Sequence, residues 1–188
     1  MNYKLILASA SPRRKQLLRD AGFEFELRLK EVVETYPEDM VCEEVPKYLS
    51  CLKAAALKST LKKDELLITA DTVVILDDMI IGKPVDRDDA IRMLTALSGR
   101  RHEVVTGVCL TTIEQQEIFG VSTYVYFAEL NREDIIYYVD NYKPFDKAGA
   151  YGIQEWIGFI GIERIEGSFY NVMGLPIQTI ARKLKEFK

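Results

Sequence analysis

The sequence predicts an α/β fold, and three observations lead to that prediction. Runs typical of buried or half-buried strands alternate with segments whose apolar residues recur at three- and four-residue steps, as on one face of a helix. Two long strand patterns near the middle, joined by a short polar turn, predict an antiparallel hairpin. The 188 residues contain no internal repeat, low-complexity segment or flexible linker. We therefore expect a single domain over 1–188, in which any two lobes share one continuous sheet.

The first half of the chain is expected to contain two strands and two helices before a central strand. Ser11 suits a helix N-cap, Pro12 the first helical position and Gly22 the position after the last turn. The expected bounds are 3–8 and 23–29 for the strands, and about 12–21 and 43–61 for the helices. A buried strand over 66–76 follows, interrupted at Asp71-Thr72.

The second half begins with a tight turn at Asp77-Asp78 and a helix capped by Asp86. The hairpin strands are expected at 102–112 and about 118–129, and a helix capped by Asn131 comes next. A strand at about 159–165 and a closing helix from 177 complete the pattern. The small-residue loops 143–152 and 166–171 suggest ligand rims, with plain structural loops as the alternative.

Composition and charge narrow the classes of function. The 25 basic and 29 acidic residues give a formal net charge of −4. No duplex nucleic-acid partner is suggested, and an anionic ligand must be met by local basic groups. The cysteines, Cys42, Cys51 and Cys109, lack metal-type spacing and are expected to be free thiols in a reducing compartment. With no signal segment and no apolar stretch near the roughly 18 residues that span a bilayer, we expect a cytoplasmic protein without a membrane partner.

The single histidine, His102, excludes a histidine pair or a histidine-rich metal site. We expect it to be a strand-edge residue after the turn at Arg100-Arg101. No nucleophilic triad can be assembled, because His102 has no evident serine or cysteine partner. The pattern G-x-x-x-x-G-K-[S/T] is missing from the sequence, which weighs against a P-loop NTPase.

A candidate anion site lies in the stretch from Ser9 to Arg14, between the first strand and the first helix. A capped helix N-terminus offers free backbone N–H groups and a favourable dipole, and the guanidinium groups of Arg13 and Arg14 match phosphate oxygens. The alternative is a well-capped surface helix with two solvated arginines. This stretch alone does not separate the two interpretations.

Three further residues stand out as candidates for chemistry. Asp71 would be costly to bury unless it is paired, bound to metal or facing a cleft, and a structural ion pair is the alternative to a functional role. Lys53 lies on or beside the apolar face of its helix, among alanines that would let its ammonium point into a cleft; a surface lysine with a packed stem is the alternative. Lys83 is held at a loop tip between Gly82 and Pro84.

Together these positions provide the residue types that a metal-assisted phosphoryl-transfer site needs. Cations hold a polyphosphate, while carboxylates hold Mg²⁺ or activate water. Glu34 belongs to a cluster of acids that by default is only a solvated loop. The basic members are Arg13, Arg14, Lys53 and Lys83, and the acidic members are Glu34 and Asp71.

Six ordered motifs resemble those of the Maf proteins, a family of nucleoside triphosphate pyrophosphatases once described as septum-formation inhibitors. The resemblance covers nearly the whole chain. It implies an α/β fold with an elongated mixed sheet flanked by helices and a cleft between two lobes, similar to inosine triphosphate pyrophosphatases. It also implies hydrolysis of an NTP between the α and β phosphates. The motifs are Leu7–Arg14, Ala70–Val74, Gly82–Pro84, Leu97–Arg100, Asp146–Gln154 and Met173–Pro176.

The resemblance also assigns roles to residues. Asp71 corresponds to the proton acceptor that activates water and also shares the metal, and Glu34 to a metal-site carboxylate, with Glu31 as a competing candidate. The implied metal is Mg²⁺, with Mn²⁺ as an alternative, and the implied assembly is a homodimer. The remaining roles fall to Ser9 and Arg13 in the triphosphate cradle, and to Lys53 and Lys83 in neutralising developing charge.

Three residues match the combination found in the branch of the family selective for dTTP and UTP: Arg14, Thr72 and Gln154. A glutamine amide can pair with both the carbonyl and the imide N–H on the edge of thymine or uracil. The alternative to a role in base selection is that Thr72 is only a β-branched strand residue and that Gln154 is only a polar residue at a rim. The resemblance does not say whether normal or modified pyrimidine nucleotides are the physiological substrates.

Two rival functions remain at this point. A non-catalytic, nucleotide-binding regulator of septum formation or cell division would not need Asp71. An NTP phosphatase cutting at the γ phosphate would use the same residue types, and only its products, NDP and orthophosphate, would differ.

Overall fold

The computed structural model describes residues 3–187, and its strands form one mixed sheet. Within those residues the sheet has seven strands in the order β2-β1-β3-β5-β6-β7, with β4 paired to β3. β1 is parallel to β2 and β3, whereas β4 is antiparallel to β3 and β7 to β6. This confirms the predicted α/β class and mixed sheet. The bounds are β1 Lys4–Leu7, β2 Phe25–Leu27, β3 Glu65–Leu76, β4 Met79–Ile81, β5 Arg101–Thr111, β6 Gln116–Phe127 and β7 Ile162–Glu166.

Three of the helices begin where the sequence predicts a capping residue. The side chain of Ser11 accepts from the backbone N–H of Arg14, and Asp86 and Asn131 cap their helices in the same way. The bounds are α1 Pro12–Asp20, α2 Val45–Lys58, α3 Arg87–Leu97, α4 Arg132–Tyr142, α5 Trp156–Gly161, α6 Phe169–Val172 and α7 Ile177–Glu186, with a 3₁₀ turn η1 at Ala148–Ala150.

The chain divides into two compact units. The first comprises residues 3–71, 106–121 and 174–187, and the second comprises Thr72–Val105 and Ser122–Met173. Strands β3, β5 and β6 contribute residues to both. The candidate site residues are divided between the two units. Ser9, Arg13, Arg14, Glu34, Lys53 and Asp71 belong to the first unit, and Thr72, Lys83 and Gln154 to the second.

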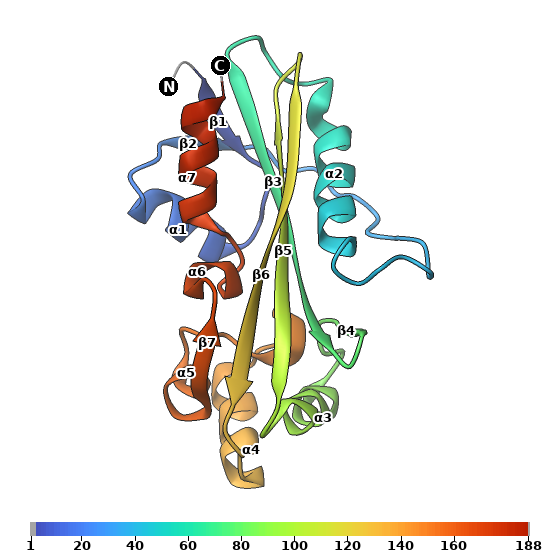
Figure 1. Cartoon of the computed structure of the whole chain (residues 1–188), viewed down its shortest axis with the longest axis vertical. Helices are drawn as coiled ribbons and strands as arrows, with labels where there is room; N and C mark the ends of the chain where they lie inside the picture. The colour runs from blue at the N-terminus through green and yellow to red at the C-terminus, as the bar shows by residue number, and fades with distance from the viewer. Residues whose placement is uncertain (1–2, 188) are drawn as a thin grey trace. The chain divides into compact units, whose positions relative to one another are not determined.

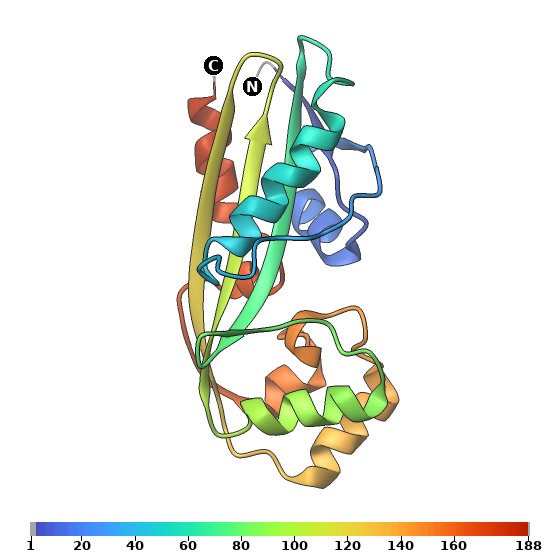
Figure 2. The same cartoon turned by 90° about the vertical axis from the view of Figure 1, so that its right-hand side faces the viewer.

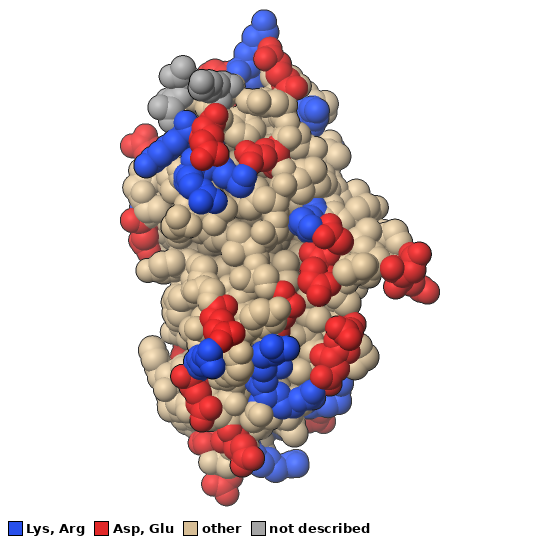
Figure 3. Space-filling view, viewed as in Figure 1, with Lys and Arg blue, Asp and Glu red and all other residues tan. Residues whose placement is uncertain are grey.

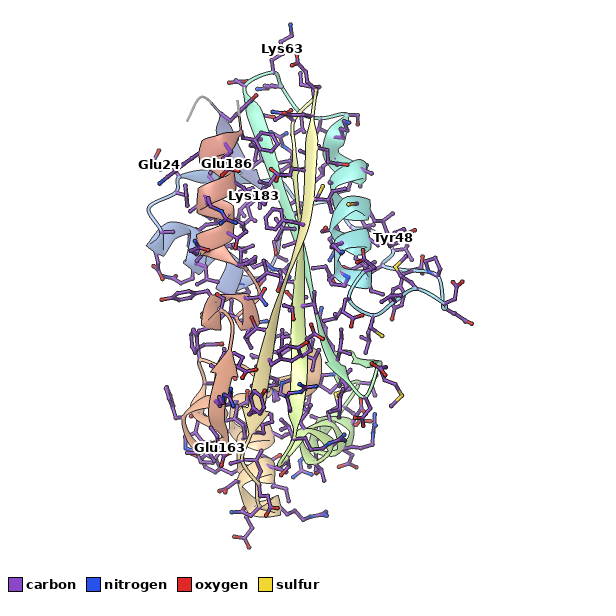
Figure 4. All side chains as sticks on the ribbon, viewed as in Figure 1. Glu24, Tyr48, Lys63, Glu163, Lys183 and Glu186 are labelled. Carbon is purple, nitrogen blue, oxygen red and sulfur yellow. The ribbon has the colours of Figure 1, made fainter. Side chains whose placement is uncertain are left out.

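In the first unit, α2 covers one face of the strands and α7 the other (Figure 1), and Figure 2 shows α2 lying across the strands. Successive residues of β6 contact α7 on one face of the sheet and α2 on the other. Lys183 of α7, labelled in Figure 4, pairs with Glu117 and lies 4.8 Å from the ring centroid of Phe119. On the opposite face, a Cβ at Gly120 would lie 3.3 Å from the stem of Lys47 in α2.

Close approach of α2 to the sheet depends on a glycine in β5. A Cβ at Gly107 would lie 2.2 Å from the backbone of Pro46, so no side chain fits between the helix and the strand. The backbone contact fixes the start of α2 on the sheet, and the helix carries Lys53 two turns further along. A larger residue at position 107 would therefore displace the candidate site as well as the core.

Several expected elements were wrong in their bounds or type. β3 runs without interruption through Asp71-Thr72, because an extended backbone needs only a partner for the carboxylate, which Lys53 provides. The strand expected at 159–165 begins as α5, and only Ile162–Glu166 is strand. The apolar run there fits either structure, and packing decides: a Cβ at Gly158 would lie 1.8 Å from the carbonyl oxygen of Ile153. The strand expected at 23–29 shortens to Phe25–Leu27, and the loop 166–171 ends in α6.

His102 is not at a strand edge, contrary to expectation, but in the core of the second unit. Its exposed fraction is 2%, its Nε2 lies 2.7 Å from the hydroxyl of Tyr151, and its ring packs on Phe127. Burial lowers the pKa of His102 to about 4. The imidazole is therefore neutral at physiological pH, and its role is to pack in the core and not to take part in catalysis.

Acid should destabilise the fold through His102. An unfolded histidine titrates near pH 6.5 whereas the folded one titrates near 4, so stability is complete above 6.5 and is lost as the pH falls towards 4. We expect the free energy of unfolding in urea to drop by roughly 2 kcal/mol between pH 7 and 4.5 from this group. His102→Gln should remove most of that slope, and equal slopes in both proteins would contradict the assignment. The window stops at pH 4.5 because Glu65, whose pKa Arg28 lowers from the usual 4.5 to about 2 by hydrogen bonding, loses its contribution as the pH falls from there towards 2.

Candidate active site

The N-terminus of α1 brings together the groups expected to bind an anion. The chain leaves β1 at Leu7, and the buried Ser9 Oγ accepts from the backbone N–H of Ser11 at 3.3 Å and from Arg14 Nη1 at 3.4 Å. Ser11 caps the helix, and Pro12 takes its first position. The hydroxyls of Ser9 and Ser11 thus hold the backbone at the start of the helix. Such a helix start favours negative charge.

Arg14 is held by the backbone of two distant segments. Its Nε donates to the carbonyl of Gly174 at 2.7 Å, and its Nη1 donates to the carbonyl of Ala70 at 2.8 Å. Burial lowers the pKa of Arg14, while nearby Asp71 opposes that shift. An arginine remains protonated under these conditions. Arg14 therefore holds β3 at the residue before Asp71 and places positive charge next to that carboxylate.

Asp71 lies on β3 in a stretch that neither β1 nor β4 covers. β1 pairs with residues 65–68 of β3, and β4 pairs with residues 74–76. Asp71 Oδ1 lies 2.7 Å from Lys53 Nζ, which donates to it. The two side chains are 13% and 17% exposed, so the pair is partly withdrawn from water but still reachable.

Lys53 also contacts a second carboxylate. Its Nζ lies 3.1 Å from Glu34 Oε1, whose side chain is 49% exposed on the loop between β2 and α2. One ammonium thus holds Asp71 and Glu34 together. It is Glu34, and not its competitor Glu31, that joins this cluster. Both acids and the lysine belong to the first unit, and so do Ser9 and Arg14.

The carboxylate pair suits a magnesium ion that completes its shell elsewhere. Among residues 3–187, no group of three His, Cys, Asp or Glu side chains is placed to hold a metal. Mg²⁺ commonly binds through one or two carboxylates, with water and substrate phosphates supplying its other ligands. Glu34 and Asp71 offer hard oxygen donors that already meet at one ammonium, so the donor set fits such an ion.

The candidates in the second unit have separate surroundings. Lys83 is exposed between Gly82, whose carbonyl accepts from Gly149 N at 3.0 Å, and the buried Pro84. Thr72 follows Asp71 directly on β3 and is partly buried. Gln154 is partly buried, and its Oε1 is fully buried without a hydrogen-bond partner among the described residues. A buried acceptor without a hydrogen-bond partner costs free energy. A hydrogen-bond donor on a ligand would remove that cost at Gln154.

Sequence reasoning missed two features near these candidates. One is the contact between Cys51, on α2 two residues before Lys53, and the buried Cys109 of β5. A hydrogen bond from the Cys109 thiol lowers the pKa of Cys51 to about 7, although burial opposes it. The same hydrogen bond and burial raise the pKa of Cys109. No spacing in the sequence signals this pair, because the residues lie on different elements and meet only in the folded protein.

The thiol of Cys51 should therefore react at unusually low pH. We expect its rate of alkylation by iodoacetamide, followed by peptide mass spectrometry, to rise with a midpoint near pH 7. Cys109→Ala removes the hydrogen-bond donor and should move the midpoint upward by at least one pH unit. A midpoint that is the same in both proteins would contradict the role of Cys109.

The other missed feature is a hydrogen-bonded network around Gln154. Tyr138 of α4 contacts both Gly152 and Glu155, and Glu155 pairs with the buried Lys147. Lys147, Gly152 and Gln154 lie in one motif of the sequence, but the partner Tyr138 precedes that motif by eight residues, on a helix whose pattern only indicated burial. A buried tyrosine usually finds a partner for its hydroxyl, and this is the only available signal.

The surface and the helices add two observations on partners. On the face drawn in Figure 3, basic and acidic side chains are interspersed rather than gathered into one basic patch. Within the part of the chain that the structure describes, no helix combines the length and apolar character required to cross a membrane.

A mixed α/β sheet that carries a cationic helix start beside a carboxylate pair is typical of proteins that bind phosphorylated ligands. The family described as Maf-like protein matches residues 4–187, and the chain belongs to the Maf family. Annotated relatives called dTTP/UTP pyrophosphatase include those of Phocaeicola vulgatus, 56% identical over 98% of this chain and 96% of the relative, and Christiangramia forsetii, 46% identical over 98% and 94%. Among solved structures, the Ham1 protein of Staphylococcus aureus has a TM-score of 0.56 at 16% identity over 98% of this chain and 100% of that one, a likeness of fold alone.

Proposed function

We propose that this protein is a nucleoside triphosphate pyrophosphatase that hydrolyses dTTP and UTP to the nucleoside monophosphate and pyrophosphate. The observation that carries the proposal is the Lys53 ammonium shared by Asp71 and Glu34, next to the Arg14 side chain at the start of α1. Names of relatives that are 46–56% identical and matched over nearly their full length support the same reaction.

In the proposed reaction, water attacks the α-phosphorus and the bond from that phosphorus to the bridging oxygen breaks. Asp71 accepts the proton of the attacking water, and Lys53 orients the carboxylate through its 2.7 Å contact. Ser9, Arg13 and the N-terminus of α1 hold the triphosphate. A divalent cation, most simply Mg²⁺, would be held by Glu34 and Asp71, and when bound it neutralises phosphate charge.

Base selection is assigned to Arg14, Thr72 and Gln154. Gln154 presents a buried acceptor without a partner, which an imide N–H of uracil or thymine would satisfy. Arg14 contributes through its fixed guanidinium, which two backbone carbonyls orient. Discrimination of this kind is strong because the wrong base leaves a buried polar group unpaired.

The decisive experiment is a product analysis of the purified protein with Mg²⁺ and each of dTTP, UTP, CTP, ATP and GTP. Pyrophosphate with TMP or UMP, and little product from the other three, is the expected result. Orthophosphate with NDP would overturn the α–β cleavage in favour of a γ-phosphatase. Binding of nucleotide without turnover would favour a regulator of septum formation. Modified pyrimidine nucleotides in the same assay would test whether they are the preferred substrates.

Lys83 is expected to stabilise charge that develops on the leaving pyrophosphate. Lys83→Ala should lower kcat for dTTP by roughly 10- to 100-fold, with a smaller effect on KM. Lys63→Ala, which removes an exposed lysine before β3 (Figure 4), is the matched control and should behave as wild type. An unchanged kcat in the Lys83 variant would remove this residue from the mechanism.

We further propose that the protein acts as a single domain, as a homodimer, and in the cytoplasm, with a nucleotide and no nucleic acid as its ligand. Free thiols and the interspersed surface charges support the compartment and the ligand class. One cooperative unfolding transition and a dimer mass in analytical ultracentrifugation are the expected results. Two separate transitions, or a monomer at micromolar concentration, would overturn the corresponding part.

A further inference from the structure

The segment that carries Gln154 is tied to helix α4 by a small polar network. The hydroxyl of Tyr138 accepts from the backbone N–H of Gly152 at 3.0 Å and donates to Glu155 Oε2. The other carboxylate oxygen, Oε1, lies 3.1 Å from Lys147 Nζ. Residues on both sides of Gln154 are thus anchored to one tyrosine in the same unit.

The network is buried except at Glu155, whose side chain is 21% exposed, so the hydrogen bonds of Tyr138 are shielded from water. Tyr138 is 0% exposed and Lys147 is 8% exposed. Burial, with the nearby Glu155 carboxylate, raises the pKa of Tyr138, so its hydroxyl stays protonated and can donate and accept at once. A phenylalanine would keep the ring but would leave the Gly152 N–H unpaired and remove one partner of Glu155.

Gly152 couples this network to the amide of Gln154. A Cβ at Gly152 would lie 2.9 Å from Gln154 Nε2 and 2.8 Å from Glu155 Cδ, so both side chains pack directly on the glycine backbone that Tyr138 holds. The amide nitrogen of Gln154 is therefore set by the turn, and its oxygen is left as a buried acceptor without a partner. A movement of Gly152 or Glu155 would displace that acceptor.

We propose that Tyr138 and Glu155 are positioning residues that set base selectivity by holding the Gln154 amide in place. The proposal deepens the proposed function and rests on it. N3 of uracil and thymine carries a hydrogen that can be donated to Gln154 Oε1, whereas N3 of neutral cytosine is an acceptor and has none. A fixed acceptor at Gln154 Oε1 favours uracil and thymine, and it leaves an unpaired polar group in a complex with cytosine. A mobile amide can instead turn to pair with any of these bases.

The test is steady-state kinetics of Tyr138→Phe with dTTP, UTP and CTP. We expect KM for dTTP and UTP to rise roughly tenfold, with kcat changed less than twofold and kcat/KM for CTP unchanged or raised, so that selectivity against CTP falls by at least about tenfold. The matched control is Tyr142→Phe, because Tyr142 stacks on Tyr138 one turn later at 5.1 Å and is 38% exposed. It should keep wild-type selectivity.

A second pair of variants separates positioning from folding. Glu155→Gln can still accept the tyrosine hydrogen bond, so it should retain more selectivity than Glu155→Ala, with thermal stability measured alongside. Unchanged selectivity in Tyr138→Phe and Glu155→Ala, whether or not their melting temperatures fall, would overturn the proposal. If wild type turns over none of these nucleotides, the proposed function itself fails. Wild-type activity with unaltered selectivity in the variants identifies failure of this inference alone.

Discussion

Replacing Asp71 by asparagine should reduce kcat for dTTP and UTP by about 10³-fold without unfolding the protein. A positioned general base contributes typically about 10² to 10⁴ in rate, and asparagine keeps the shape of the side chain but cannot take a proton. The backbone of β3 is extended through position 71, and Glu34 remains as a partner for Lys53. The loss should therefore appear in turnover, and circular dichroism should show the fold retained.

The matched control for this variant is Asp77→Asn. Asp77 also forms an ion pair, with Arg100, but at the turn after β3 rather than in the candidate site. Its substitution should leave kcat within about twofold, since a surface ion pair contributes little. If Asp71→Asn and Asp77→Asn are equally active, Asp71 is not the base and the proton must go elsewhere.

Local features of the fold could be predicted from sequence because each depends on a few neighbouring residues. Ser11, Asp86 and Asn131 cap their helices as expected, since a capping side chain needs only the N–H groups that follow it. The turn at Asp77-Asp78 is another case, and both residues take positive φ there. Apolar periodicity likewise predicted the closing helix from 177, in which Ile177, Ile180 and Leu184 are buried.

Features that depend on contacts between distant segments could not be predicted from those patterns. The run at 156–162 is apolar throughout, and its first part is a helix whose Ile157 is buried in the core of the second unit among residues far away in the chain. His102 was predicted at a strand edge, but it is buried against Tyr151, which lies 49 positions away in the sequence. The site divides in the same way. The sequence indicated Lys53, Asp71 and Glu34 as candidates. The contact of one ammonium with both carboxylates, however, depends on the fold.

The same ammonium leads to a second large effect, which Lys53→Met should reveal. Methionine keeps much of the apolar stem but removes the charge that neutralises Asp71 and Glu34. Turnover should fall by about 10²-fold, because the base loses the group that orients it. Binding of Mn²⁺ without nucleotide, followed by electron paramagnetic resonance, should instead tighten by at least about tenfold, since two adjacent carboxylates without a cation attract a divalent ion more strongly.

Opposite changes in activity and metal affinity distinguish this explanation from simple damage to the protein. Lys47→Met provides the control, because Lys47 lies on the same helix and pairs with the exposed Glu44 outside the candidate site, so neither quantity should change. A Lys53 variant that loses turnover while its Mn²⁺ affinity stays at the wild-type value would show that Glu34 and Asp71 do not hold the metal. Lys53 would then act on the phosphates or on Asp71 alone, and the ion would have to be carried into the site by the nucleotide.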